Sequence, residues 1–199
     1  MENTWQVLLD IDGVLADFTR AVYRWFGLEY EEHPEPGVYH YTEKRIQELT
    51  GTPAGMFWKV IDNYEFWRNI PKYPWTHALI RQVTALVGKE NVWLISSVPF
   101  PTASAGRQMW IQEQLHETFW MFRTLLGSPK FLCARKGHVL IDDSDVNCDN
   151  FSAWGGKTVL FPAMWNRRLI SQFDATKHDQ ILEIVRRELR GIVQDNIES

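Results

Sequence analysis

Two aspartates, Asp10 and Asp12, follow the apolar run at residues 7–9, and Gly13 comes directly after them. The run is typical of a buried strand, and side chains two positions apart on a strand share a face. Two carboxylates on one face at the end of a buried strand repel each other, and their burial without a partner is costly. A divalent cation with oxygen ligands, such as Mg²⁺, offsets that cost. The alternative is a solvated strand end followed by a glycine turn.

Length, charge and composition exclude several classes of protein. The chain has 199 residues, 45% of them hydrophobic and 14% aromatic, which suits one medium domain or one domain with a small insertion. The net charge is −4 and no basic tract occurs, so we expect no nucleic-acid polymer as a partner. No apolar run approaches the ~18 residues of a membrane span, and the N-terminal residues lack a signal-peptide pattern. We therefore expect a cytoplasmic protein without a membrane partner, in which Cys133 and Cys148 are reduced thiols.

Strand and helix patterns alternate from residue 76 onward. The expected strands lie at 92–96, 131–133, 139–142 and 158–161, and the expected helices at about 76–87, 102–116, 145–153 and 177–193. This alternation is typical of a Rossmann-like, doubly wound α/β fold with a parallel sheet, to which residues 5–11 add one strand.

Residues 18–75 depart from this alternation because their patterns are mostly helical, with helices expected at about 15–27 and 43–50. The chain must leave and return at one edge of the sheet, so this segment is interpreted as an insertion. We expect a core of residues 1–17 and 76–199 and a small helical cap of residues 18–75, inserted after the first strand.

Three of the expected strands end in polar side chains. Asp10 and Asp12 follow the first, Ser96 and Ser97 end the strand at 92–96, and Asp142 and Asp143 end the strand at 139–142. In open parallel sheets, ligands bind at the carboxyl ends of the strands. The sequence therefore predicts a functional site that these three strand ends form together.

The three strand ends, in this order, resemble motifs of the haloacid dehalogenase (HAD) phosphatase superfamily. The D-I-D-G segment at 10–13 resembles its first motif, the apolar strand ending at Ser96 its second, and V-L-I-D-D at 139–143 its fourth. The resemblance implies Mg²⁺-dependent hydrolysis of a phosphate monoester. It implies that Asp10 attacks phosphorus, that Asp12 is the general acid and base, and that Ser96 donates to a phosphoryl oxygen.

The resemblance also implies a metal site and a lysine. Its expected metal residues are Asp10, Asp12, Asp142 and Asp143, and which of the last two binds directly stays open. The lysine of the third motif offsets the negative charge of the nucleophile and the phosphate. Lys130 is favoured because it precedes the expected strand at 131–133, and Lys136, in an R-K-G turn, is the alternative.

The first motif is also similar to a narrower group. The segment D-G-V-L-A-D-F at 12–18 is similar to the start of the 5′(3′)-deoxyribonucleotidase group, whose cap is a small helical insertion after the first strand. This implies nucleoside monophosphates, in particular deoxy ones, as small-molecule substrates. Ser97 is expected to contact the substrate, and in the loop after the last strand so is Asn166, with Arg167 as the alternative.

Aromatic residues in the expected cap support two interpretations. Trp58, Phe66 and Trp67 could stack on a nucleobase, or they could form the core of the cap. For stacking, Trp67 is favoured over Trp58 because it lies closer to Pro71, where the chain returns to the core.

Two alternatives to a nucleotidase stay open. The first keeps the chemistry and changes the substrate to a sugar phosphate or another small phosphoester. The second is a non-catalytic module that binds a phosphorylated ligand. Degenerate members of a fold usually lose the nucleophile or the metal ligands, whereas all four aspartates are present here.

Overall fold

The structure, a computed structural model, describes residues 5–30, 41–116 and 123–194. These residues form a parallel sheet in the order β3-β2-β1-β4-β5. The strands are β1 (Gln6–Asp10), β2 (Val92–Ser96), β3 (Thr124–Leu126), β4 (His138–Asp142) and β5 (Lys157–Leu160). The strand that leads to the first aspartate is therefore central, paired with β2 on one side and β4 on the other. The carboxyl ends of β1, β2 and β4 meet at one edge, as the sequence predicts.

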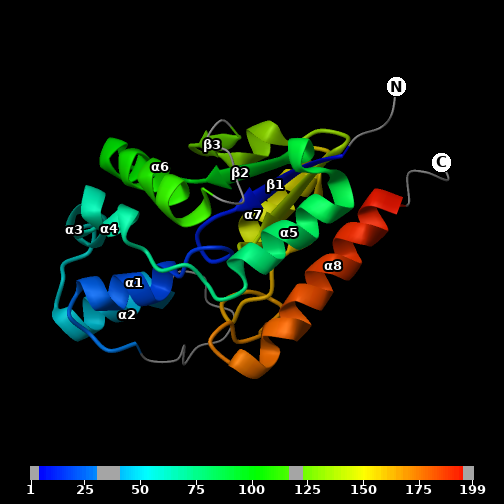
Figure 1. The fold of residues 1–199 in the computed structure, drawn as a ribbon. Coiled ribbons are helices and arrows are strands. Elements are labelled where there is room, and N and C mark those ends of the chain that lie inside the picture. Colours follow the sequence, from blue (N-terminus) through cyan, green and yellow to red (C-terminus); the bar gives the residue numbers. More distant parts are fainter. Residues whose placement is uncertain (1–4, 31–40, 117–122, 195–199) are drawn as a thin grey trace.

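Helices cover both faces of the sheet (Figure 1). Val7 and Leu9 belong to the large apolar core beneath α5 (Thr76–Val87) and α8 (His178–Gln194). Leu8, between them in sequence, packs on the other face with Leu140 and with Phe151 of α7 (Asp145–Ala153). This alternation is what a strand buried on both faces requires. The doubly wound α/β fold expected from the sequence is confirmed.

The segment between β1 and α5 has four helices among its described residues and lies to one side of the sheet (Figure 1). These are α1 (Phe18–Trp25), α2 (Tyr41–Thr50), α3 (Phe57–Val60) and α4 (Tyr64–Arg68). The chain leaves and returns at one place, since the Asp17 N–H donates to the Pro71 carbonyl at 2.7 Å and the Tyr73 N–H to the Leu15 carbonyl at 2.9 Å. The division into a core and a cap of residues 18–75 stays a prediction, and we use the word cap for this segment.

The expected strand at 131–133 is wrong. These residues belong to η2, a 3₁₀ helix at Lys130–Cys133, and Leu132 is 69% exposed. The strand that pairs with β2 at the sheet edge is β3, which the sequence analysis missed because it has only three residues. A short apolar run has no periodicity that separates a strand from a helical turn.

The expected start of the first helix, at residue 15, is also wrong. The Leu15 and Ala16 N–H groups both donate to the Ile11 carbonyl, so a tight turn occupies this stretch. The helix α1 begins only after Asp17, whose side chain accepts from the Arg20 N–H as an N-cap. This turn carries the chain from the site into the cap.

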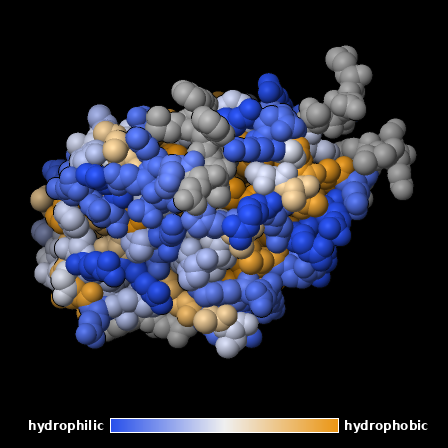
Figure 2. Space-filling view, in the orientation of Figure 1, coloured by the Kyte–Doolittle hydropathy of each residue, from blue (hydrophilic) through white to orange (hydrophobic). Residues whose placement is uncertain are grey.

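The surface shown in Figure 2 is largely hydrophilic, with apolar residues scattered over it. Within the described ranges, no helix has the length and apolarity needed to cross a membrane. Cys133 and Cys148 are both free thiols.

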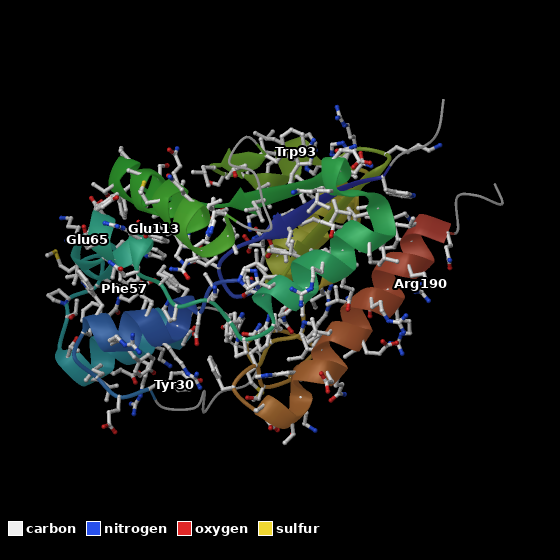
Figure 3. All side chains as sticks on the ribbon, in the orientation of Figure 1. Tyr30, Phe57, Glu65, Trp93, Glu113 and Arg190 are labelled. Carbon is white, nitrogen blue, oxygen red and sulfur yellow. The ribbon has the colours of Figure 1, made fainter. Side chains whose placement is uncertain are left out.

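The cap packs on the core through α4 and α6 (Pro101–Leu115). An ion pair between Arg68 of α4 and Glu113 of α6 lies at this contact, and Figure 3 shows Glu113 beside Glu65 there. The two helices approach closely at Gly106, where a Cβ atom would lie 2.6 Å from the Tyr64 carbonyl oxygen and 2.7 Å from the Trp67 Cβ. Only glycine fits this position without movement of one helix.

We expect Gly106→Ala to lower the free energy of unfolding by about 1–3 kcal/mol, because the added methyl group forces α4 and α6 apart. Gly191→Ala in α8 is the matched control, since nothing lies within 4 Å of its Cβ position. There the same substitution should stabilise the protein by roughly 0.5–1 kcal/mol through helix propensity. Urea unfolding of both variants measures this, and stabilisation of both would contradict the close contact.

Candidate active site

The polar ends of β1 and β4 open into a cavity of about 220 Å³ between the sheet and the cap. Asp10, Asp12, Ser97, Lys130 and Asp143 line it on the core side, and Phe18, Phe57, Trp58 and Trp67 on the cap side. Figure 3 shows Phe57 among the cap helices. One wall of the cavity is therefore charged and the opposite wall is aromatic.

Lys130 is the cation at the centre of the charged wall. Its buried Nζ lies 2.6 Å from Asp10 Oδ1 and 2.6 Å from Asp142 Oδ2. Burial alone would lower the pKa of Lys130, but the two carboxylates outweigh burial and raise it above its ordinary value. Lys136 is exposed and borders a separate pocket with Gly137 and His138. Of the two candidate lysines, the structure brings Lys130 to the aspartates.

Asp10, Asp142 and Asp143 form a cluster of buried carboxylates in which one oxygen of each lies within 4.8 Å of the others. Burial raises the pKa of Asp10, the two neighbouring carboxylates add to this, and Lys130 offsets part of the rise. Burial and Asp142 likewise raise the pKa of Asp143. The cluster holds more negative charge than one lysine neutralises, which suits a bound divalent cation.

Asp142 and Asp143 differ in the hydrogen bonds that their carboxylate oxygens accept. Asp142 accepts hydrogen bonds from the Ser144 N–H at 2.9 Å, from Asn147 Nδ2 and from Lys130 Nζ, so both its oxygens are used. Asp143 Oδ2 accepts from Trp165 Nε1 at 2.6 Å, whereas its buried Oδ1 has no hydrogen-bond partner in the described part of the chain. An unpaired buried carboxylate oxygen beside Asp10 fits a Mg²⁺ ion. Asp10 and Asp143 are thus the residues that could hold the metal directly.

The Asp12 side chain is not one of the three clustered carboxylates, and its expected place at the metal stays a prediction. Its Oδ2 accepts from Ser96 Oγ at 3.1 Å, and its Oδ1 pairs with the Arg107 guanidinium. The shared face assumed for Asp10 and Asp12 holds only within a strand, and β1 ends at Asp10. Gly13, with φ of +78°, then turns the chain. The two carboxylates therefore point to different partners on the same cavity.

Sequence reasoning missed Arg107 and Trp165. Arg107 is fully buried on α6, on the stripe that also carries Ala103, Trp110 and Ile111. An arginine on the apolar stripe of a helix is the signal that could have found it, because arginine is almost never fully buried without a partner. Trp165 could have been noted from its place in the loop after the last strand.

Two of the expected substrate contacts do not line the cavity. Asn166 is fully buried, and its Nδ2 donates to the Asp143 and Phe161 carbonyls, so its side chain fixes the loop behind the site. Phe66 is 2% exposed and packs edge-on against Trp67 as part of the cap core. Ser97 does line the cavity, while Ser96 is buried and faces Asp12.

Trp58 and Trp67 both line the cavity, but they differ in burial. Trp67 is 2% exposed and its Nε1 donates to the Ile61 carbonyl at 2.8 Å, so it is held within the cap. Trp58 is partly exposed, and its Nε1 donates to Glu43 Oε2 at 3.3 Å. The structure therefore favours Trp58 for a stacking contact, which reverses the preference drawn from distance to Pro71.

A family model described as "5′ nucleotidase, deoxy (Pyrimidine), cytosolic type C protein" matches residues 4–189 of the chain. A hydrolase from Streptococcus pneumoniae TIGR4 has a similar structure, with a TM-score of 0.54 and 13% identity over 83% of this chain and 97% of that one. A phosphonoacetaldehyde hydrolase-like protein from Oleispira antarctica has a TM-score of 0.51 and 10% identity, over 96% of this chain and 86% of that one. A magnesium complex of a HAD family enzyme from Bacteroides thetaiotaomicron has a TM-score of 0.44 and 19% identity, over 82% of this chain and 95% of that one. No curated protein sequence matches the chain significantly.

The orphaned oxygen of Asp143 leads to a prediction on metal binding. We expect Mg²⁺ at a hundredfold excess over its Kd to stabilise the protein by about 2.7 kcal/mol. Asp143→Asn should abolish this gain, and without metal it should unfold no lower than the wild type because one repelling buried charge is gone. Thermal unfolding with EDTA and with Mg²⁺ measures both effects.

Asp149→Asn is the control for that measurement. Asp149 lies exposed on α7 and pairs with Arg167, away from the cluster. It should keep the full response to Mg²⁺. An unchanged Mg²⁺ response in Asp143→Asn would show that Asp143 does not hold the ion.

Proposed function

Because the chain belongs to the family of cytosolic type C deoxy (pyrimidine) 5′ nucleotidases, we propose that it is a Mg²⁺-dependent phosphomonoesterase of nucleoside monophosphates, in particular deoxy ones. We propose further that it acts through an aspartyl-phosphate on Asp10. The core of residues 1–17 and 76–199 would carry the chemistry, and the cap of residues 18–75 would select the substrate.

One observation carries the proposal: Asp10 lies buried at the centre of the charged wall with one oxygen left for reaction. The Ile11 N–H, at 2.8 Å, and Lys130 Nζ, at 2.6 Å, both reach Oδ1. Oδ2 is therefore the oxygen available to attack phosphorus. A carboxylate that is held on one side and free on the other is suited to act as a nucleophile.

The residues of the site divide the reaction between them. Asp10 Oδ2 attacks phosphorus, the ester P–O bond breaks, and Asp12 gives a proton to the leaving oxygen. In the second half, Asp12 takes a proton from the water that attacks phosphorus, and the Asp10 carboxylate is released. Lys130 offsets the charge that gathers around phosphorus. A Mg²⁺ ion held by Asp143 beside Asp10 would supply further neutralisation of the phosphate.

The aromatic wall supports a nucleotide as the substrate. The rings of Phe18 and Trp58 are stacked, with their centroids 6.4 Å apart and an interplanar angle of 21°. Both residues line the cavity opposite the carboxylates. A nucleoside monophosphate needs both kinds of wall, because its phosphate meets the charged residues while its base can stack on an aromatic ring. A sugar phosphate has no planar base to stack on the aromatic wall.

Hydrolysis by the wild type and by Asp10→Asn tests the reaction. We expect the wild type to hydrolyse deoxynucleoside monophosphates faster than sugar phosphates with Mg²⁺, and to be inactive with EDTA. Asp10→Asn should lose several orders of magnitude in kcat, since an amide is a poor nucleophile. Retention of more than about a tenth of the wild-type kcat, a loss of only ~1.4 kcal/mol, would rule out Asp10 as the nucleophile. A folded wild type without Mg²⁺-dependent turnover on any phosphoester would favour the non-catalytic binding module.

We expect Trp58→Ala to raise KM for deoxynucleotides about tenfold, since base stacking is worth ~1–3 kcal/mol, and to change activity on an aryl phosphate little. Trp67→Ala is the comparison, because Trp67 is buried in the cap. It should lower the free energy of unfolding by roughly 3–5 kcal/mol and reduce activity on both substrates. Steady-state kinetics and thermal unfolding of both variants decide the matter. Equal losses on both substrates in Trp58→Ala would assign Trp58 to the cap core.

A further inference from the structure

Arg107 is a fully buried cation outside the cluster formed by Asp10, Asp142 and Asp143. Its Nη2 pairs with Asp12 Oδ1, and it comes from α6, which packs on α4 of the cap. Its Nε and Nη1 are also buried and have no hydrogen-bond partner among the described residues. Since a buried charge with unused donors costs free energy, the stability of the fold does not explain why an arginine lies here.

The guanidinium of Arg107 is held from both sides of the cap–core contact. Its Cζ lies 5.4 Å from the ring centroid of Trp67 on α4 and 5.2 Å from that of Trp110 on α6. These rings are themselves fixed, since Trp67 Nε1 donates to the Ile61 carbonyl and Trp110 Nε1 to the Ile70 carbonyl, at 2.6 Å. Cation–π contacts of a desolvated arginine favour one orientation of its plane. The guanidinium is therefore held by one ring of the cap and one ring of the core.

The other end of this arrangement is the Asp12 carboxyl group. Arg107 engages Oδ1 and the Ser96 hydroxyl engages Oδ2, so the plane of the carboxyl group is fixed by two donors. Both donors are fully buried, whereas the Asp12 side chain is 24% exposed and lines the cavity. Each carboxylate oxygen has two acceptor sites, so the two donors named here leave capacity on both oxygens of this cavity-lining side chain.

We propose that Arg107 is a positioning residue, which fixes the Asp12 carboxyl group toward the ester oxygen of the substrate. This rests on the proposed function, in which Asp12 exchanges protons with the leaving alcohol and the attacking water. Because Trp67 belongs to the cap, the arrangement is complete only when the cap is seated on α6. The proton donor is thereby linked to the segment that covers the substrate.

The dependence of kcat/KM on the leaving group separates this role from a structural one. An alkyl phosphate needs a proton on its leaving oxygen, whereas p-nitrophenyl phosphate releases a stable phenolate without one. In Arg107→Met we expect kcat/KM to fall about 100-fold for the alkyl phosphate that the wild type hydrolyses fastest, the contribution typical of a general acid. The fall for p-nitrophenyl phosphate should be below about 5-fold, since transfer to Asp10 needs no proton there. Arg107→Lys, which keeps the charge and folds more readily, should show the same selectivity with a smaller loss.

The double variant and two controls make the test specific. Asp12→Asn should show the same selectivity, and Arg107→Met in that background should cost no more than about threefold further, since both changes remove one function. Arg68→Met removes another arginine from the α4–α6 contact, where its partner is Glu113. It should lower kcat/KM only slightly, and equally for both substrates. The stabilisation by Mg²⁺ should persist in Arg107→Met, because the carboxylate cluster is intact.

The outcomes separate the two proposals. Equal losses on both substrates in the Arg107 variants, or additive losses in the double variant, would show that Arg107 only supports the fold, while Asp12→Asn still reports on the proposed reaction. If Asp12→Asn itself shows no selectivity, the assignment of Asp12 as the acid fails, and the role of Arg107 fails with it.

Discussion

The mutual repulsion of Asp10, Asp142 and Asp143, with Lys130 among them, is the constraint on which the site depends. Burial raises the pKa of Asp10 and of Asp143, and three neighbouring elements supply donors to the cluster. The 3₁₀ helix η2 brings the lysine, the start of α7 brings the Ser144 N–H and Asn147, and the loop after β5 brings Trp165. Since these elements satisfy Asp142 fully and Asp143 only in part, the remaining charge is concentrated where a cation can bind.

Asp10 and Asp12 lie on one cavity but in different electrostatic surroundings. Asp10 shares Lys130 with the other buried carboxylates, whereas Asp12 is held by Ser96 and by the guanidinium of Arg107. Environments that differ in this way allow two chemically identical side chains to take different roles, one as nucleophile and one as proton donor. The end of β1 and the turn at Gly13 create this separation. In a continued strand, side chains two positions apart would lie on one face, and both carboxylates would point the same way.

The cap does more than cover the cavity. Trp58 and Phe18 present an aromatic wall to the site, while Trp67 and Phe66 form an apolar interior that holds the cap helices together. Trp67 also borders the cavity, and its ring contacts the guanidinium of Arg107 on the core. The glycine at position 106 lets α4 and α6 approach closely enough for that contact. In the reaction proposed above, substrate selection and proton transfer would thus depend on one packed interface.

The sequence by itself determined the class of fold and the place of the site. The apolar runs before Asp10, Ser96 and Asp142 are long enough to predict strands, and parallel strands bring their carboxyl ends together whatever the details of packing. It did not determine β3, the 3₁₀ form of 130–133 or the burial of Phe66 and Asn166, because short runs and single polar residues carry no periodicity. Only the tertiary structure decided that Asp143 keeps the free oxygen and that Arg107, 95 positions from Asp12, is its partner. Those choices depend on which side chains meet across distant elements, and local sequence patterns hold no record of that.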